Sequence, residues 1–290
     1  MYMLNFRDLG AHYRKVREAR GYSMGDVTSD NLHKSQVSRF ENGTQMLLLD
    51  GFMHAINGLN MTVSEFFLTI GNFEVGSLQI FSEKLQELIT AQDIDGLKAL
   101  IIRKPRTNEK KIFNIKVKCA IRELSAQNLL TDEETQFIDK YLTDCEEWTM
   151  FDTTVFSMCL EALDTVLVYQ LGLQLIEKNT FYKTLPYNAQ IVKRTLVNVY
   201  VYMIFRGCFV YAEEFEKQLN TLLKPTDTDE KITIQIFKKI LIYRKKKKPE
   251  LLSEISRDIH ALKDLGAQGL AERIEIFLLI IQSPKSAGEC

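Results

Sequence analysis

The chain has 290 residues, of which 46% are hydrophobic and 26% are charged, so it can form two domains and is too apolar to be disordered. Its formal net charge of −1 excludes a whole-molecule field that attracts nucleic acid, so any DNA site has to be a local patch. The N-terminal residues become charged within seven positions, and the longest apolar runs are too short to span a bilayer. Five cysteines without a CxxC pair favour a reducing compartment. We therefore expect a cytoplasmic protein with no membrane partner.

The first seventy residues predict a compact unit of short helices. Apolar residues recur at spacings of three and four along almost the whole chain, and no stretch alternates over a strand's length, so the expected fold is all-α. Ser23 and Thr62 are candidate N-caps, because an acidic residue follows each of them by three positions. We predict a domain over 1–70 with helices near 5–20, 24–30, 34–41, 47–58 and 63–70.

The stretch "HKSQVSRFENG", residues 33–43, has the composition of a helix that enters a DNA groove. On a helix, Val37 and Phe40 fall on one side with Glu41 beside them, which leaves the opposite side short-chained, uncharged or positive. Such a face can approach base edges without repelling phosphate. The candidate DNA contacts are Lys34, Ser35, Gln36, Ser38, Arg39 and Asn42, with Arg14 on the preceding basic helix. A solvated surface helix is the alternative interpretation.

A structural ion pair is predicted between Arg17 of the first helix and Glu41 of the third. Such a pair would hold the third helix at a fixed angle, while the short helix near 24–30 would lie across the DNA backbone.

The run "LGAHYRKVREARGYSMGDVTSDNLHKSQVSRFENG", followed by "LNMTVSEFF", resembles the N-terminal helix-turn-helix of the Rgg family of Gram-positive transcriptional regulators, a variant of the phage-repressor type. The family's Ser-Gln-x-Ser-Arg-Phe-Glu-x-Gly core stands here as Ser35 to Gly43. The chain departs from the family at His33, where Ser is frequent at the cap, and at Asn42, where a basic residue is frequent. These departures weaken the cap and remove one charge.

Residues 71–78, with two glycines in "GNFEVGS", interrupt the helical pattern and predict a linker. From residue 79 to 290 the expected helices are longer, and successive pairs repeat at intervals typical of stacked tetratricopeptide-like hairpins, an α-solenoid. A plain helical bundle is the alternative. The strongest segments are predicted at 108–127, 131–147, 149–162, 164–179, 186–206, 208–223, 228–247, 249–264 and 267–282.

The resemblance to the Rgg family continues at "EEWTMFDTTVF" and at "LVNVYVYMIFRGCFVYAEEFEKQL", so it covers most of the chain. It implies a homodimer that reads two half-sites in promoter DNA, where RNA polymerase would be a further partner. It also implies that the concave face of the repeat domain binds a short hydrophobic signalling peptide.

The sequence itself offers polar side chains for such a ligand among the expected first helices of the repeats. Asn198 leads, because it interrupts an apolar run where an unpaired amide is costly, and one amide side chain can pair with one peptide unit. For each candidate, ordinary packing or solvation is the alternative. The predicted peptide-binding residues are Asn198, Tyr202, Arg194, Phe156, Gln235 and Lys239.

Several other functions lack support in the sequence. The run "YRKKKKP" at 243–249 is more typical of a solvated helix C-terminus than of a second DNA contact. No glycine-rich phosphate loop, GxSxG, HExxH or metal-ligand spacing occurs, so we predict no enzyme, no metal and no cofactor. A helical-repeat adaptor for other proteins, tethered to DNA, remains the competing function.

Overall fold

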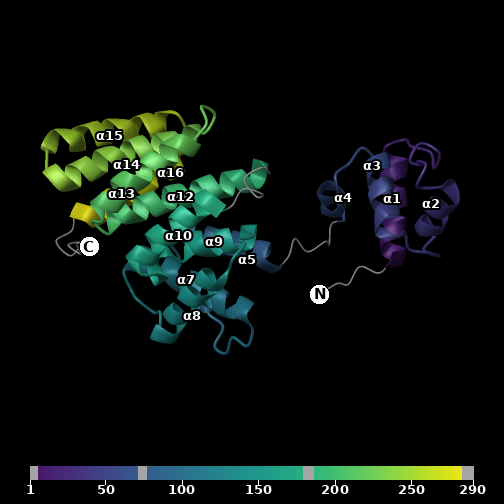
Figure 1. The fold of residues 1–290 in the computed structure, drawn as a ribbon, viewed down its shortest axis with the longest axis horizontal. Helices are drawn as coiled ribbons and strands as arrows, with labels where there is room; N and C mark the ends of the chain where they lie inside the picture. Colours follow the sequence, from purple (N-terminus) through teal and green to yellow (C-terminus); the bar gives the residue numbers. More distant parts are fainter. Residues whose placement is uncertain (1–5, 71–76, 179–185, 283–290) are drawn as a thin grey trace. The chain divides into compact units, whose positions relative to one another are not determined.

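The computed structural model describes residues 6–70, 77–178 and 186–282, and its contacts divide the chain into two compact units (Figure 1). The first unit is Met1–Glu87 and the second is Leu88–Cys290. The division falls within helix α5 (Ser77–Thr90), beyond the predicted start of the second domain at residue 79. Most of the predicted linker, 71–78, lies outside the described residues.

The first unit is a cluster of short helices around an aromatic core. Tyr13, Phe40, Phe52 and Phe66 are buried, and their rings meet at tilted or edge-to-face angles with centroids 5.6–6.1 Å apart. The Tyr13 hydroxyl donates to the carbonyl oxygen of Ala55 at 3.0 Å, so this phenol is satisfied inside the core. The helices are α1 (Phe6–Ala19), α2 (Lys34–Glu41), α3 (Leu49–Gly58) and α4 (Val63–Thr69).

The helix expected near 24–30 is absent, and turns occupy residues 24–27. The cap does form, since the amide of Ser23 donates to the Asp26 carboxylate at 2.7 Å and the amide of Asp26 donates to the Ser23 hydroxyl at 3.3 Å. No helix follows because Ser29 and Leu32 form an isolated β-bridge, which pulls the chain out of helical geometry after one turn. The segment before α2 is therefore a capped turn.

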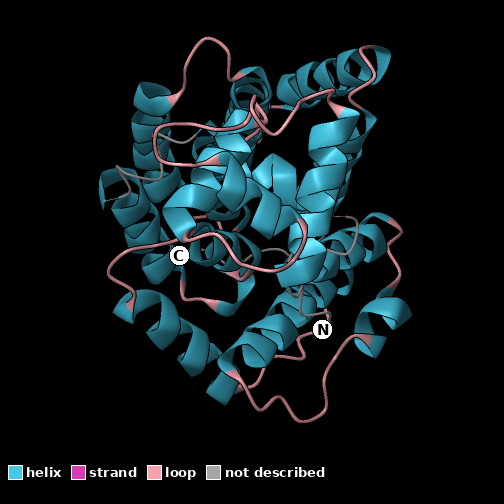
Figure 2. Cartoon of the chain, turned by 90° about the vertical axis from the view of Figure 1, so that its right-hand side faces the viewer, coloured by secondary structure: helices cyan, strands magenta, loops and turns pink. Residues whose placement is uncertain are grey.

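The second unit is built from longer helices, and no strand occurs in the parts of the chain that are described (Figure 2). Threonine caps open several of them, including α7 at Thr107 and α8 at Thr131. The elements are α6 (Ile94–Ala99), α7 (Asn108–Ser125), α8 (Asp132–Asp144), α9 (Met150–Met158), the 3₁₀ turn η1 (Leu160–Ala162), α10 (Thr165–Lys178), α12 (Pro186–Phe205), α13 (Phe209–Leu222), α14 (Thr228–Lys246), α15 (Pro249–Asp264) and α16 (Gln268–Gln282).

Consecutive helices of this unit pack as neighbours, α12 on α13, α14 on α15 and α15 on α16. Helix α12 also contacts α9 and α14, the first helices of the adjoining pairs. Phe277 of α16 packs edge-on against Phe205 of α12 and Phe237 of α14. This stacking of helical hairpins is the all-α repeat architecture expected from the sequence.

Two features bear on the expected setting of the chain. Cys119, Cys145 and Cys159 are free thiols, but Cys208 is disulfide-bonded, which departs from the expectation of reduced cysteines. Within the described ranges, no helix combines the length and the apolar character that crossing a membrane requires.

Candidate nucleic-acid interface and ligand-binding surface

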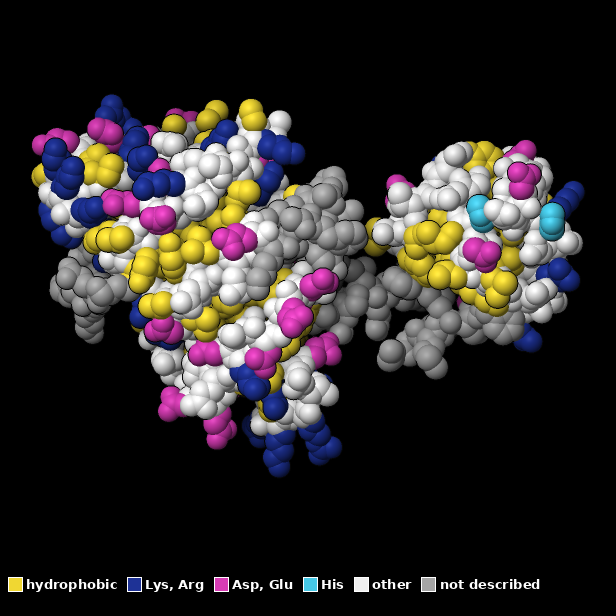
Figure 3. Space-filling view, in the orientation of Figure 1, with side chains coloured by type: hydrophobic (Ala, Val, Ile, Leu, Met, Phe, Trp, Pro, Cys, Tyr) yellow, Lys and Arg dark blue, Asp and Glu magenta, His cyan; other side chains and the backbone are white. Residues whose placement is uncertain are grey.

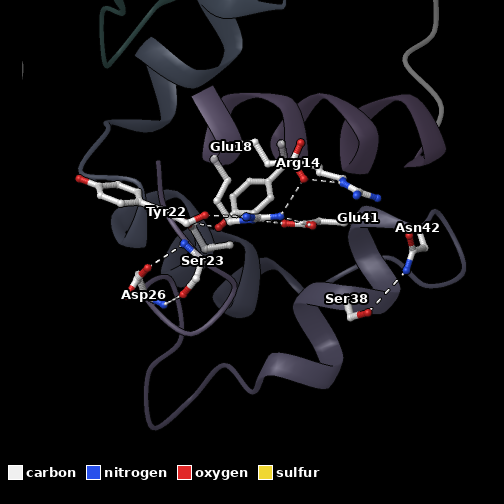
Figure 4. Close-up of polar contacts among 11 residues, drawn as sticks. Arg14, Glu18, Tyr22, Ser23, Asp26, Ser38, Glu41 and Asn42 are labelled. Carbon is white, nitrogen blue, oxygen red and sulfur yellow. Dashed lines mark hydrogen bonds and ion pairs between the residues drawn. The ribbon is translucent and has the colours of Figure 1, made fainter. Parts of the chain in front are cut away.

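Helix α2 is held tightly against α1 at two points. The first is Gly10, where an added Cβ would lie only 1.9 Å from the carbonyl oxygen of Phe40, so no other residue permits this approach. The second is the predicted pair of Arg17 and Glu41 (Figure 4). The guanidinium donates to both carboxylate oxygens, at 2.6 and 2.8 Å, and also to the carbonyl of Tyr22 at 2.6 Å. Together these contacts fix the angle at which α2 presents its outer face.

The outer face of α2 has the polar character expected from the sequence. Val37, Phe40 and Glu41 are buried, while Lys34, Ser35, Arg39 and Asn42 are exposed and Gln36 and Ser38 are partly exposed. No acidic side chain of α2 lies on this face, because its one carboxylate is the buried Glu41. Phosphate would therefore meet only neutral or positive groups there.

Four of the predicted DNA-contacting side chains already have partners. The Gln36 amide oxygen accepts from the amide of His33 at 2.8 Å, which closes the start of α2 and compensates for the missing Ser cap. The Asn42 amide donates to the Ser38 hydroxyl at 3.5 Å. Arg14 lies on α1 and forms an exposed pair with Glu18 at 2.8 Å (Figure 4). The bond between the His33 amide and Gln36 could not be predicted from the sequence, because it depends on the side-chain rotamer of Gln36.

In the second unit, polar side chains form a stripe along α12. Arg194, Asn198, Tyr202 and Arg206 follow one another at intervals of four residues, so they share one side of the helix and its C-terminal end. We call these four residues the α12 stripe. Asn198 is exposed and its amide donates to the hydroxyl of Ser157 on α9 at 3.0 Å, which leaves its carbonyl oxygen and one N–H available.

The C-terminal end of the α12 stripe joins a charged cluster. Arg122 of α7 donates to the carbonyl of Glu161 at 2.7 Å and lies 3.4 Å from its carboxylate, while the Arg206 guanidinium lies 5.8 Å from the centroid of the Tyr202 ring. Burial raises the pKa of Glu161, and the charges of Arg122 and Arg206 oppose that rise. This cluster offers both acidic and basic partners to a ligand.

Tyr202 is the most unusual member of the α12 stripe. Its side chain is only 6% exposed, and its hydroxyl lies near Thr165 without a well-formed hydrogen bond to any described residue. Burial raises the pKa of this phenol to about 12, so it is a neutral donor at ordinary pH. Because an unpaired buried hydroxyl costs free energy, a ligand acceptor placed here would be favoured.

The other predicted ligand contacts are placed differently. Phe156 is fully buried and packs edge-on against Trp148 at 5.1 Å, so it is a core residue and not a surface contact. Lys239 faces α15, where it pairs with Asp258 at 2.6 Å and Glu254 at 3.7 Å. Gln235 is exposed one turn before Lys239. The Arg194 side chain is 67% exposed and lies 3.9 Å from Glu230.

Arg122, Glu161 and Arg206 were not predicted from the sequence. The four-residue spacing from Asn198 through Tyr202 indicates Arg206, and this signal was available. Arg122 and Glu161 come from other elements, and only the folding of α7 against η1 brings them to this place.

Comparisons with known proteins identify relatives of both units. Residues 98–276 match the family profile of the HTH-type transcriptional regulator Rgg, C-terminal domain. The fold is similar to that of the Streptococcus dysgalactiae SHP pheromone receptor Rgg2, at 17% identity and a TM-score of 0.74 over 92% of this chain and 97% of that one. A putative transcriptional regulator from Listeria monocytogenes EGD-e matches at 19% identity and a TM-score of 0.73 over 94% and 97%. The receptor of a bacterial peptide pheromone/receptor complex matches at 15% identity and a TM-score of 0.65, over 95% of this chain and 98% of that one.

Proposed function

The chain belongs to the Rgg family of helix-turn-helix transcriptional regulators, and we propose that a short hydrophobic peptide controls its activity on promoter DNA. In this proposal a cytoplasmic homodimer places the two copies of α2 in successive major grooves, and the repeat unit binds the peptide along the α12 stripe. Ligand binding then changes the relative populations of two placements of the DNA-binding units. A protein of this kind would serve quorum sensing.

The DNA-binding part rests on α2. Its outer face is free of acidic side chains and carries Lys34 and Arg39, and the buried Arg17–Glu41 pair sets its angle. A fixed helix with short polar side chains suits base contact in a groove.

The DNA-binding part can be tested with operator duplexes selected from a random pool by the purified protein. Arg39→Ala should weaken specific binding by about tenfold or more at constant salt, because a lost base contact is worth about 1–3 kcal/mol. Gln36→Ala should weaken it as well, and helical content should stay unchanged in both variants. Arg257→Ala removes one exposed charge from α15 and is the matched control. Equal affinity for wild type and Arg39→Ala would exclude α2 as the reading helix.

The ligand-binding part rests on one observation, the exposed amide of Asn198, which uses only one N–H in its bond to Ser157 and keeps its carbonyl oxygen and other N–H for a ligand. An extended peptide carries unpaired backbone N–H and C=O groups, and the exposed Asn198 amide can pair with one of each. The relatives described above include a pheromone receptor and a peptide pheromone/receptor complex, which supports a peptide as the ligand class.

The ligand can be sought by fluorescence polarisation with short hydrophobic peptides encoded by small open reading frames beside the gene. A saturable signal that Asn198→Ala abolishes, while DNA binding persists, is the expected result. Asn220→Ala on α13 is the matched control, because Asn220 is also an exposed helical asparagine. Normal peptide affinity of the Asn198→Ala variant would refute the assignment to the α12 stripe.

A further inference from the structure

The connection between α6 and α7 carries a dense basic surface that the proposed function does not use. Residues 98–111 contain six basic side chains and one acidic one, in a chain whose formal net charge is −1. All six basic side chains are exposed, and Figure 3 shows Lys and Arg side chains projecting as a group from the repeat unit. We call this surface the α6–α7 basic patch. Its members are Lys98, Arg103, Lys104, Arg106, Lys110 and Lys111.

Among the described residues, these charges have almost no partners. None of the six has an ion pair with a carboxylate of the described residues, and Lys111 alone has a described partner, the ring of Phe137 at 5.1 Å. By contrast, the basic run on α14 is partly neutralised. Arg244 donates to the carbonyls of Ile204 and Phe205, and Lys245 pairs with Glu213. Lys246, Lys247 and Lys248 follow as exposed cations, with the Tyr243 ring 5.7 Å from Lys247, so the end of this run is a comparison of equal charge at another position.

The α6–α7 connection is also held in place on both sides of its basic residues. The buried Asn114 side chain accepts from the amide of Ile102 at 2.9 Å and donates to the carbonyl of Ile102 at 2.8 Å. At the other side, the Thr107 hydroxyl accepts from the amide of Lys110 at 3.3 Å and caps α7. Arg103, Lys104 and Arg106 are thus displayed from a short anchored segment, which lowers the entropy that binding would cost.

The chemistry of the patch favours phosphate over a protein partner. No large apolar side chain is exposed between residues 83 and 149, so a protein would find no hydrophobic anchor there. Closely spaced, unpaired Lys and Arg side chains are the groups that neutralise the phosphates of a duplex. The covalent connection to the α2 unit would also keep the patch at high effective concentration near any DNA that α2 holds.

We propose that the α6–α7 basic patch binds the phosphate backbone of duplex DNA and adds a sequence-independent contact to that of α2. The proposal rests on the proposed DNA-binding function. Binding of this kind releases counterions, and each phosphate contact contributes about 0.9 to the slope of log affinity against log salt concentration. The patch should therefore be detected in the salt dependence of DNA binding.

The test uses the full chain and a fluorescent duplex of roughly 40 base pairs of mixed sequence, because nonspecific binding is the electrostatic term. The patch variant is Arg103→Gln, Lys104→Gln and Arg106→Gln. The matched control is Lys246→Gln, Lys247→Gln and Lys248→Gln, which removes the same charge from the α14 run. Affinity is measured from roughly 50 to 200 mM KCl. Over this range, each pair of phosphate contacts makes the affinity fall about tenfold further.

The patch variant should show a slope smaller by about 2.7, because three cations are removed at about 0.9 each, and a clear loss of affinity at the lowest salt, while the control variant stays near wild type. An unchanged slope would overturn the proposal. An equal loss in the control variant would also overturn it, because net charge and not position would then be responsible. A Lys34→Gln, Arg39→Gln variant separates the two claims. If this variant loses affinity and the patch variant does not, only the patch proposal fails. If the patch variant loses affinity while this variant and the control do not, the assignment of α2 fails.

Discussion

Replacing Arg17 by Met should destabilise the first unit more than any other single charge removal there. The Arg17 side chain is 6% exposed and that of Glu41 is 0% exposed, and two hydrogen bonds of 2.6 and 2.8 Å join them. Arg17→Met keeps the length of the side chain but leaves the Glu41 carboxylate buried without its cation. It also leaves the Tyr22 carbonyl without its donor.

The expected cost is about 3–5 kcal/mol, the range observed when one partner of a buried pair is removed. Glu41→Leu should cost less, because Arg17 would keep the Tyr22 carbonyl and the Glu18 carboxylate, 3.5 Å away. The double variant should be less destabilised than the sum of the single ones, with a coupling of about 1–3 kcal/mol, since no buried charge then remains unpaired. Against a total stability of about 5–15 kcal/mol, the single change is large.

The full chain is unfolded in urea, and hydrogen exchange at the amides of α1 and α2 is the probe. This probe gives the free energy of unfolding of the first unit separately from that of the second. Arg14→Met is the matched control, because its pair with Glu18 lies on the same helix with side chains 50% and 52% exposed. Water and salt screen such an exposed pair, so its loss should change stability little. If Arg17→Met costs no more than Arg14→Met, the argument from burial is refuted.

Three further changes have defined outcomes. Gly10→Ala should separate α1 from α2 and cost about 3 kcal/mol in urea unfolding, because its Cβ would meet the Phe40 carbonyl oxygen at 1.9 Å; a neutral result would show that α1 can shift freely. Lys116→Met should raise stability by about 1 kcal/mol or more near pH 7, since burial lowers the pKa of Lys116, and the gap should close as pH rises from that lowered pKa toward the ordinary one. Asp139→Asn should stabilise the chain increasingly as pH rises above about 3.8, because burial, reinforced by Asp164, raises the pKa of Asp139 and makes its ionisation unfavourable. The measurement is the melting temperature of both proteins as a function of pH. A difference in melting temperature that does not change with pH would contradict this.

The positions of many helices, short and long, can be predicted from the sequence because their signals are local. The sequence predicts α2 at 34–41 and the helix occupies Lys34–Glu41, and it predicts α15 at 249–264 where the helix occupies Pro249–Asp264. Proline at the start of α15 and apolar spacing along both helices suffice for such assignments. Helices α5 and α6 were not expected individually, because α6 is short and the glycines beside α5 hide its beginning.

The candidate sites could be predicted only where a contact joins residues on recognisable helix faces. The Arg17–Glu41 pair was predictable because both residues stand on faces that the apolar pattern turns toward each other. Phe156 is fully buried between helices, and its periodicity does not distinguish an inner groove from such a core position. The neighbours of Tyr202 come from α7 and η1, and single-chain spacing contains no information about that juxtaposition.

The packing of α12 on α9, α10, α13 and α14 restricts how the chain can diverge in evolution. Most of its residues are fixed by neighbours on several sides, whereas Arg194 and Asn198 are exposed. Exchanges at exposed positions usually change stability by less than about 0.5 kcal/mol. Descendants of this protein can therefore alter these two positions without first acquiring compensating changes in the scaffold, and under the proposed function such exchanges would alter the preferred ligand. New signal preferences would then arise by single steps.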